Sequence, residues 1–425
     1  MPQKILLLSN LLGPFGGGED VFLQTYQALV NAGCEVECFG TNKQPFFDTI
    51  QVTYQKQFPD YVDYDNAHSL LEKLALVKKP FTNPDAAKGL DAVLGAFKPD
   101  LIHMHSVFWN LTPSVLKACT KHGIPIVMTL HEARLICPAG TLMKGNDTYC
   151  DEAPCSRGNS LPAVMNRCYD GSLTKSMLVA AEFTFRRLTH SFDHVNYFVC
   201  PSEALAELVV SRYGIPKHQV LSISNPIENS WLDLPRPTEL GKYFLFVGRL
   251  SKEKGVHTLL RAIHLVDPEM PLKIIGTGPE EDALKKLTLE LDLPNVEFLG
   301  FKAKADIIPY YQNAIATVVP SEWFETYGMT IVESLACGRP VIASRTGGPK
   351  NIIEQSKAGH SFKMGDVNDL ASLLSECYEF PEKALALADQ AQSYVRYECN
   401  LKHYETRLME LYHQALNKEE SPNHA

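Results

Sequence analysis

The sequence has no uninterrupted run of about 18 apolar residues, the shortest stretch that indicates a membrane-spanning helix. Its first apolar run, Ile5 to Leu8, ends at Ser9 and Asn10, and no small-residue cleavage site follows at a suitable distance. This segment therefore lacks the pattern of a secretory signal peptide. We expect a cytoplasmic protein, since the remaining composition is that of an ordinary globular chain.

Positive charge is scarce relative to negative charge: 40 Lys and Arg residues stand against 49 Asp and Glu residues, a formal net charge of −9. Nucleic-acid-binding proteins need basic surface to displace counterions, so this balance argues against nucleic acid as a partner. The cysteines also lack the pattern of a disulfide framework, because their number, eleven, is odd and most lie scattered in apolar segments. In a cytosolic chain such residues behave as small buried hydrophobes.

The dinucleotide-binding fingerprint G-x-G-x-x-G is absent. Three glycines, Gly16 to Gly18, follow an apolar strand and precede a helix predicted from Val21 to Gly33, but position 21 is valine and no acidic ribose ligand follows. A dehydrogenase is therefore disfavoured. Gly17 and Gly18 can bring backbone amides close to an anion at the helix N-terminus, or they can form a tight turn and nothing more.

Strands and helices alternate along most of the chain and predict an α/β protein. A length of 425 residues is enough for more than one hydrophobic core. A proline-rich stretch over residues 225–242 is typical of an interdomain linker. We therefore expect an N-terminal domain over residues 1–228, a C-terminal domain over residues 229–395 and a final helical segment over residues 396–418.

Two carboxylates follow one apolar strand in the second half of the chain. The segment from Pro320 to Gly338 reads PSEWFETYGMTIVESLACG, with Glu325 on a loop and Glu333 on a helix predicted from Met329 to Cys337. This order places both side chains at the carboxyl edge of a parallel sheet, where such folds bind ligands. If every step between them were helical, their Cα atoms would lie about 12 Å apart. We therefore expect them to contact different parts of one extended ligand.

Three histidines lie at the ends of two neighbouring strands. His103 and His105 are two residues apart in the predicted strand LIHMHS and share one face, and His131, followed by Glu132, ends the next strand. The arrangement fits either a metal site or the wall of an active site, and the residues alone leave both open.

Two glycine-rich turns open the second domain. Arg249 and Lys254 flank the first turn, between an apolar strand and a helix, and Gly276 and Gly278 form a similar turn one strand later. Fixed cations at a helix N-terminus suit a diphosphate, whereas a solvated surface turn is the plainer alternative. No D-x-D motif stands at a plausible strand end, so we expect no catalytic divalent metal.

These motifs resemble the retaining glycosyltransferases of family 4, which have the GT-B fold. The resemblance rests on P-S-x-x-x-E-x-x-G-x-x-x-x-E-x-x-A-C-G, on G-R-L-x-x-x-K-G from Gly248 to Gly255, and on D-x-x-H-x-H from Asp100 to His105. It covers nearly the whole chain and is strongest from Phe244 to Gly348. It implies two facing Rossmann-like domains, with a C-terminal helix from Leu401 that crosses back to the first domain.

The resemblance also implies roles for single residues. Glu325, facing the donor sugar, and His131, on the acceptor side, are the expected catalytic residues, while Glu333 holds the ribose. Arg249 and Lys254 hold the diphosphate of the leaving nucleotide. The other residues expected at the nucleotide-sugar are Gly17, Gly18, Gly276, Gly278, Leu299, Gly300, Phe301, Tyr327, Gly328 and Met329.

Two positions depart from the family pattern. Glu132 stands where Asp or Asn is commoner, and Lys350–Asn351 replaces a Pro-Glu pair after the last glycines. The second departure weakens any role for that loop.

The implied activity is the transfer of a sugar, with retention, from a UDP- or GDP-sugar to a saccharide or lipid-linked saccharide acceptor. Such a reaction serves the synthesis of cell-surface polysaccharides or glycoconjugates and requires no further cofactor. Two alternatives stay open. A nucleotide-sugar 2-epimerase of the same architecture would turn over the donor without an acceptor, and a non-catalytic sensor would bind the donor without turnover.

A segment rich in Gly, Pro, Asn and Asp, residues 137–168, forms a predicted insert in the first domain. Four thiolates there could form a structural zinc clip, but the usual C-x2–4-C spacing is missing, and four unlinked thiols are the alternative. The cysteines concerned are Cys137, Cys150, Cys155 and Cys168.

A helix predicted from Lys175 to Phe192 follows the insert. Its apolar periodicity predicts that Leu188 is buried and that Arg186 is solvated. A basic amphipathic helix of this kind packs on the core or lies on anionic lipid, so peripheral contact with the inner face of the membrane stays open.

Overall fold

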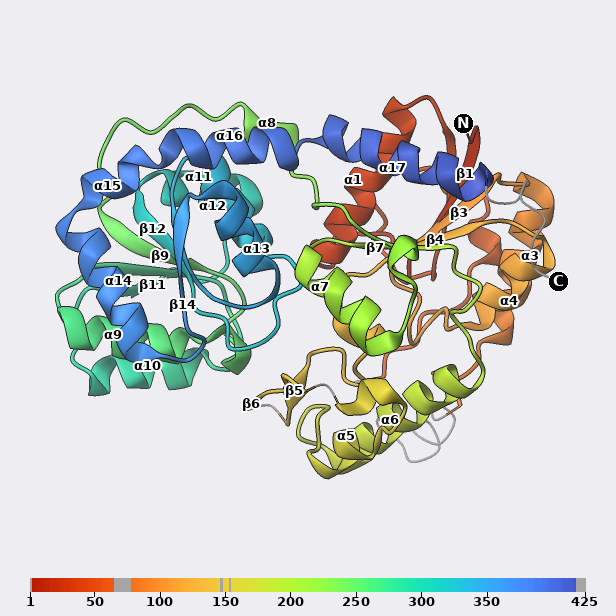
Figure 1. Ribbon diagram of the computed structural model, residues 1–425, viewed down its shortest axis with the longest axis horizontal. Coiled ribbons are helices and arrows are strands. Elements are labelled where there is room, and N and C mark those ends of the chain that lie inside the picture. The colour runs from red at the N-terminus through yellow and green to blue at the C-terminus, as the bar shows by residue number, and fades with distance from the viewer. Residues whose placement is uncertain (1, 65–77, 146–147, 153, 418–425) are drawn as a thin grey trace.

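The computed structural model describes residues 2–64, 78–145, 148–152 and 154–417. These residues form two α/β lobes that lie side by side (Figure 1). Each lobe is built on a six-stranded sheet whose paired strands are all parallel. The expected pair of facing Rossmann-like domains is therefore observed.

The first sheet has the strand order β2-β1-β3-β4-β7-β8. Its strands are apolar along most of their length, as expected of a parallel sheet that is covered on both faces. The order reverses between β1 and β3, so the loops after these strands leave the sheet beside one crevice. The strands are β1 (Lys4–Leu8), β2 (Glu35–Phe39), β3 (Leu101–Met104), β4 (Ile126–Thr129), β7 (Tyr197–Cys200) and β8 (Val220–Ser222).

The second sheet has the order β11-β10-β9-β12-β13-β14 and reverses between β9 and β12. The loops that follow these two strands are the ones that carry Arg249, Lys254 and Glu325. The strands are β9 (Tyr243–Val247), β10 (Leu272–Ile275), β11 (Val296–Phe298), β12 (Ala314–Val319), β13 (Val341–Ser344) and β14 (Gly359–Phe362).

Helices cover the sheets, and one short helix, α5, lies in the insert. The first lobe and its insert contain α1 (Gly17–Asn31), α3 (Pro84–Phe97), α4 (Ser114–Lys121), α5 (Leu161–Met165), α6 (Leu173–Leu188) and α7 (Glu203–Leu208), with a short ribbon of β5 (Met143–Lys144) and β6 (Thr148–Tyr149). The second lobe contains α8 (Asn229–Leu232), α9 (Val256–Val266), α10 (Glu281–Glu290), α11 (Lys304–Gln312), α12 (Met329–Ala336), α13 (Gly347–Ser356), α14 (Val367–Glu379), α15 (Pro381–Ala386) and α16 (Ala388–Glu398).

Two predicted helix starts can be compared with the structure. α12 begins at Met329 as predicted, after Gly328, whose φ of 108° is easily adopted only by glycine. α1 begins at Gly17, four residues before the predicted start, and carries Glu19 and Asp20 in its first turn. Acidic side chains stabilise the N-terminal end of a helix, and these two help the glycine-rich turn to become helical.

The prediction for α6 is wrong about which face is buried. The side chain of Leu188 is 75% exposed, whereas Arg186 is 2% exposed. Arg186 forms an ion pair with Glu182 one turn earlier, and its guanidinium lies 5.0 Å from the centre of the Phe108 ring. A guanidinium can be buried when it is paired with a carboxylate and packed against aromatic rings. The spacing of apolar residues therefore predicted the wrong buried face for α6.

The last helix, α17 (Leu401–Asn417), crosses from the second lobe and packs beside α1 (Figure 1). Leu408 and Leu411 are buried in the hydrophobic core of the first lobe. The Tyr404 and Tyr412 hydroxyls hydrogen-bond to Thr25 Oγ1 at 2.8 Å and to His103 Nδ1 at 2.5 Å. The predicted crossing helix is therefore confirmed.

Direct hydrogen bonds also join the lobes near their facing edges. The Ser202 hydroxyl donates to the Thr326 carbonyl at 2.7 Å, and Lys304 contacts Asp20 at 3.1 Å and Glu228 at 2.9 Å. None of the helices in the described part of the chain has both the length and the apolar character needed to cross a membrane.

We predict that Leu408→Ala destabilises the protein by about 2–5 kcal/mol, because it removes a fully buried side chain from the core of the first lobe. Gln414→Ala, at an exposed position of the same helix, is the matched control and should have little effect. Denaturant unfolding measures both. Equal midpoints for the two variants would show that α17 adds no packing to the first lobe.

Candidate active site

Glu325 lies in the loop after β12, where its carboxylate is surrounded by donors. Its Oε2 accepts hydrogen bonds from Lys254 Nζ at 2.9 Å, from Trp323 Nε1 at 2.9 Å and from Ser321 Oγ at 3.2 Å. Burial alone would raise the pKa of Glu325, but the Lys254 charge and these hydrogen bonds lower it below the ordinary value. Glu325 is therefore ionised at neutral pH.

The two cations predicted at the diphosphate share one turn after β9 but have different surroundings. Lys254 pairs with Glu325, while Arg249 is exposed and has no acidic partner among the described residues. The structure thus brings Lys254, Arg249 and Glu325 to one edge of the second sheet. It leaves one of the two cations without a fixed counter-charge.

The glycines of the next turn are explained by packing. A Cβ atom on Gly276 would lie 1.9 Å from the Gly248 carbonyl oxygen, and one on Gly278 would lie 2.2 Å from that of Leu250. These glycines let the turns after β9 and β10 touch through their backbones. Gly276 also donates its N–H to the Gly300 carbonyl at 2.9 Å, which brings the predicted base-contacting segment, Leu299 to Phe301, beside them.

Glu333 occupies a different environment from Glu325. It is 9% exposed on α12 and accepts a hydrogen bond from the Tyr311 hydroxyl at 2.7 Å. Burial raises the pKa of Glu333 to about 7, with Tyr311 opposing the rise. At neutral pH Glu325 is therefore ionised, whereas Glu333 is only partly ionised.

The residues between the two carboxylates serve mainly to hold the loop and the start of α12 in place. The buried Tyr327 directs its hydroxyl to the Asn225 carbonyl at 3.3 Å, in the segment that links the lobes. Gly328 and Met329 form the N-terminal end of α12. Their predicted contact with the nucleotide-sugar stays a prediction.

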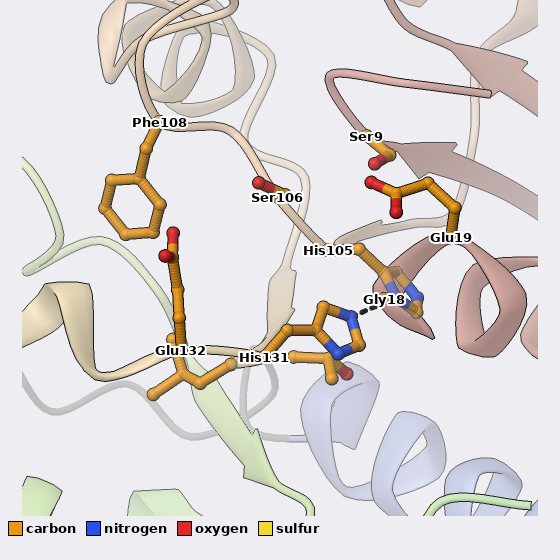
Figure 2. Close-up of a pocket in the computed structure, with 10 residues that line it drawn as sticks. Ser9, Gly18, Glu19, His105, Ser106, Phe108, His131 and Glu132 are labelled. Atoms are coloured by element: carbon orange, nitrogen blue, oxygen red, sulfur yellow. Dashed lines mark hydrogen bonds between the residues drawn. The ribbon is translucent and has the colours of Figure 1, made fainter. Parts of the chain in front are cut away.

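His131, at the end of β4, lines a cavity of about 290 Å³ (Figure 2). A Cβ atom on Gly18 would lie 3.5 Å from His131 Cγ, so the glycine-rich start of α1 packs against the imidazole ring. Burial lowers the pKa of His131 to about 4, and the ring is therefore neutral at pH 7. The carboxylates of Glu19 and Glu132 line the same cavity.

The histidines do not form a metal centre. His105 Nδ1 lies 2.9 Å from His131 Nε2, while His103 bonds through Nδ1 to Tyr412 and through Nε2 to Thr129. Within the described ranges, no group of three or more His, Cys, Asp or Glu side chains is placed to hold a metal ion. Of the two interpretations left open by the sequence, the geometry favours an active-site wall.

The two lobes meet where the predicted catalytic residues lie. The Thr326 hydroxyl, next to Glu325, donates to the backbone carbonyl of His131 at 3.0 Å. Together with the bond from Ser202 to the Thr326 carbonyl, this hydrogen bond holds the loop of the second lobe against the first lobe.

A second cavity, of about 670 Å³, opens beside the first and was not predicted from the sequence. Both cavities are lined by Glu19, Ser106, Phe108 and Glu132. Aromatic rings from three distant segments form much of the wall of the second cavity, and grouped aromatics in polar stretches were the available signal. The aromatic side chains are Tyr61, Tyr64, Phe108, Trp109 and Tyr169.

A buried cation supports the boundary between the cavities. Arg134 Nε donates to Glu132 Oε1 at 3.0 Å, and its guanidinium lies 5.2 Å from the centre of the Trp109 ring. Arg134 thereby orients Glu132, which lines both cavities, and also supports Trp109.

The four cysteines of the insert surround one small cavity of about 20 Å³. Burial raises the pKa of the Cys155 thiol to about 12, so it is protonated as the structure stands. Among the described residues, no three Cys, His, Asp or Glu side chains are placed to hold a metal ion. The zinc clip stays a prediction, and metal content measured on the purified protein tests it. The residues are Cys137, Cys150, Cys155 and Cys168.

Two family profiles match the chain in tandem. The profile of Glycosyltransferase Family 4 matches residues 15–231, just over half of the chain, and that of Glycosyl transferases group 1 matches residues 235–394.

Curated relatives are similar over part of their length. An uncharacterized glycosyltransferase of Methanocaldococcus jannaschii is 25% identical over 55% of this chain and 64% of its own. The D-inositol 3-phosphate glycosyltransferase of Corynebacterium jeikeium is 32% identical over 35% of this chain and 38% of its own. The glycogen synthase of Mycobacterium tuberculosis is 24% identical over 77% of this chain and 72% of its own.

Solved structures share the fold over nearly the whole chain. Anabaena HepE in complex with UDP has a TM-score of 0.65 at 19% identity, covering 97% of this chain and 100% of that one. Sucrose-phosphate synthase of Thermosynechococcus elongatus has a TM-score of 0.68 at 19% identity, covering 98% and 100%. The predicted GT-B architecture is confirmed.

We predict that Glu333→Gln becomes more stable relative to the wild type as the pH rises from 5 to 8. The folded protein holds the Glu333 proton up to about pH 7, whereas an unfolded glutamate releases it near pH 4.5, so stability is lost as the pH rises through this window. Glutamine cannot ionise and escapes that loss. Melting temperatures across the range measure the effect, with Glu354→Gln, on a 61% exposed side chain, as control. A constant difference between variant and wild type would contradict the raised pKa.

Proposed function

Because the profile of Glycosyltransferase Family 4 matches just over half of it, the chain belongs to that family, and we propose that it is a retaining glycosyltransferase. It transfers a sugar from a nucleotide-sugar to a saccharide or lipid-linked saccharide, in the synthesis of a cell-surface polysaccharide or glycoconjugate. The observation that carries this proposal is the hydrogen bond from Thr326 to the His131 carbonyl. It holds the loop of the second lobe that carries Glu325 against the segment of the first lobe that carries His131.

The donor is a UDP- or GDP-sugar, bound on the second lobe. Arg249 and Lys254 neutralise the diphosphate, and the Lys254 ammonium has three donors, so it can contact a phosphate while keeping Glu325 in place. Glu333 accepts from the ribose hydroxyls, and the segment from Leu299 to Phe301 contacts the base. Stabilisation of the leaving group by fixed cations replaces a divalent metal. The UDP bound in the HepE structure supports this donor class.

The acceptor occupies the aromatic cavity of the first lobe. Broad aromatic faces suit the apolar faces of sugar rings, and the carboxylates of Glu19 and Glu132 accept from their hydroxyl groups. The cavity joins the smaller one that contains His131, which gives an acceptor hydroxyl a route to the donor sugar.

Exposed apolar side chains on α5 and α6 support a lipid-linked acceptor at the inner face of the cytoplasmic membrane. α6 also lines the aromatic cavity through Leu178 and Val179, so a lipid surface beneath it would lie next to the acceptor. The exposed side chains are Leu161, Met165, Leu173, Met177 and Leu188.

We predict that Arg249→Ala and Lys254→Ala each lower kcat by at least about a hundredfold, the scale expected for removing one preorganised charge from a transition state. Lys252→Ala, on an exposed side chain of the same turn, is the control and should stay near the wild-type rate. The assay measures transfer from a radiolabelled nucleotide-sugar in the presence of EDTA. Wild-type rates for both folded variants would remove the diphosphate role, and activity that EDTA abolishes and manganese restores would require a metal.

We predict that an α-linked donor gives an α-linked product. Glu325 belongs to the donor lobe and pairs with Lys254 there, so it is not placed as a base opposite the leaving group. An oxygen of the departing phosphate is then the nearest base, and the acceptor enters on the face that the nucleotide leaves. NMR of the anomeric coupling in the isolated product measures the outcome. A β-linked product would overturn both the retaining mechanism and the role given to Glu325.

A further inference from the structure

Two imidazoles in the wall of the cavity, the half-buried His131 and the buried His105, lie side by side. His105 Nδ1 and His131 Nε2 are 2.9 Å apart, and the ring planes differ by 25°, which suits a hydrogen bond in the plane of both rings (Figure 2). Burial lowers both pKa values, that of His131 to about 4, so each ring carries one proton at neutral pH. Two arrangements remain, since either ring can be the donor.

The far nitrogen of His105 distinguishes the two arrangements. His105 Nε2 is buried and has no hydrogen-bond partner among the described residues. The neighbouring Phe22 ring packs edge-to-face at 5.3 Å between centroids and offers at most a weak acceptor. Buried N–H groups without an acceptor are rarer than unused acceptors. The proton of His105 is therefore better placed on Nδ1, where it is donated to His131.

His103 holds this arrangement in place without competing for its protons. Both of its ring nitrogens are engaged, one by Tyr412 of α17 and the other by Thr129 of β4. Its ring packs against that of His105 with 4.6 Å between centroids. His105 is thus held between a fixed imidazole and an aromatic ring, with His131 as its polar partner.

We propose that His105 is a positioning residue that holds His131 as the Nδ1–H tautomer, so that the cavity is offered one N–H donor by this ring. His131 Nδ1 forms no hydrogen bond within the described residues and is not one of the buried unpartnered atoms. A sugar hydroxyl can accept a hydrogen bond, so it can bind to His131 Nδ1–H. The tautomer of His131 does not depend on the proposed function. The assignment of the bound hydroxyl to the acceptor sugar does.

NMR of protein with ¹⁵N-labelled histidine rings tests the tautomer directly at pH 7.5. The chain has 14 histidines, so His131→Gln and His105→Asn serve to assign signals by their loss. The expected result is a protonated Nδ1 and an unprotonated Nε2 in both His105 and His131. The opposite tautomer of His131 would overturn the proposal. This measurement needs no catalytic activity, so a failure of the proposed function would leave it interpretable.

A matched pair of variants tests the consequence for the reaction. His105→Asp presents a carboxylate that accepts a hydrogen bond from His131 Nε2–H, which makes Nδ1 the unprotonated nitrogen. His105→Asn has nearly the same shape and can still donate. We expect kcat to fall about tenfold in the Asp variant, the effect of one lost hydrogen bond, and to stay closer to wild type in the Asn variant. Nucleotide affinity should be unchanged in both.

The same samples give the outcomes that contradict the proposal. Equal losses of kcat in the two variants, with the His131 signals of each unchanged from wild type, would mean that His105 serves packing alone. If the Asp variant fails to fold, the wild-type spectrum still shows the tautomer of His131, and the Asn variant still shows whether a donor at position 105 maintains it. A wild-type protein that binds nucleotide but transfers no sugar would refute the proposed function and leave the tautomer result standing.

Discussion

The ion pair between Lys254 and Glu325 is the interaction on which the site depends. A carboxylate as enclosed as Glu325 stays ionised only if a cation and hydrogen-bond donors replace the water that it has lost. Lys254 supplies the charge from the turn after β9, and the carboxylate follows β12, so the pair joins the two loops at the switch point of the sheet. The turns are close enough that a Cβ atom on Gly255 would lie 2.0 Å from the Pro320 carbonyl oxygen. Charge and backbone packing therefore specify the same local structure.

The two carboxylates of one motif have different surroundings, and their pKa values are shifted in opposite directions. Glu325 faces cationic and polar donors, whereas the buried Glu333 accepts from a tyrosine hydroxyl. The first stays charged and the second holds its proton to about pH 7. A ligand that brings hydroxyl groups meets an acceptor of low charge at Glu333, while one that brings phosphate meets the cations of the turn after β9.

Much of this site could be predicted because its signals are local. The strand, loop and helix around Glu325 and Glu333 lie in one continuous segment, and so does the turn with Arg249 and Lys254. The face of α6 could not be predicted, because the burial of Arg186 depends on Phe108, which lies in another part of the chain. The aromatic cavity could not be predicted for the same reason, since its wall is formed by segments that are far apart in the sequence. The contact that fixes His103 is made by Tyr412, more than three hundred residues away.

The placement of α17 has a consequence for how the protein is made. The first lobe is translated early, but part of its core is supplied by α17, which follows the second lobe in the sequence. The ribosome must therefore release the second lobe and α17 before the first lobe can close, and until then a nascent chain exposes the apolar surface that α17 covers. A messenger RNA truncated before the codon for Leu401 would yield a product that has both sheets but exposes the apolar surface of the first lobe that α17 normally covers. Chaperones and proteases could distinguish that product from the finished protein by this surface alone.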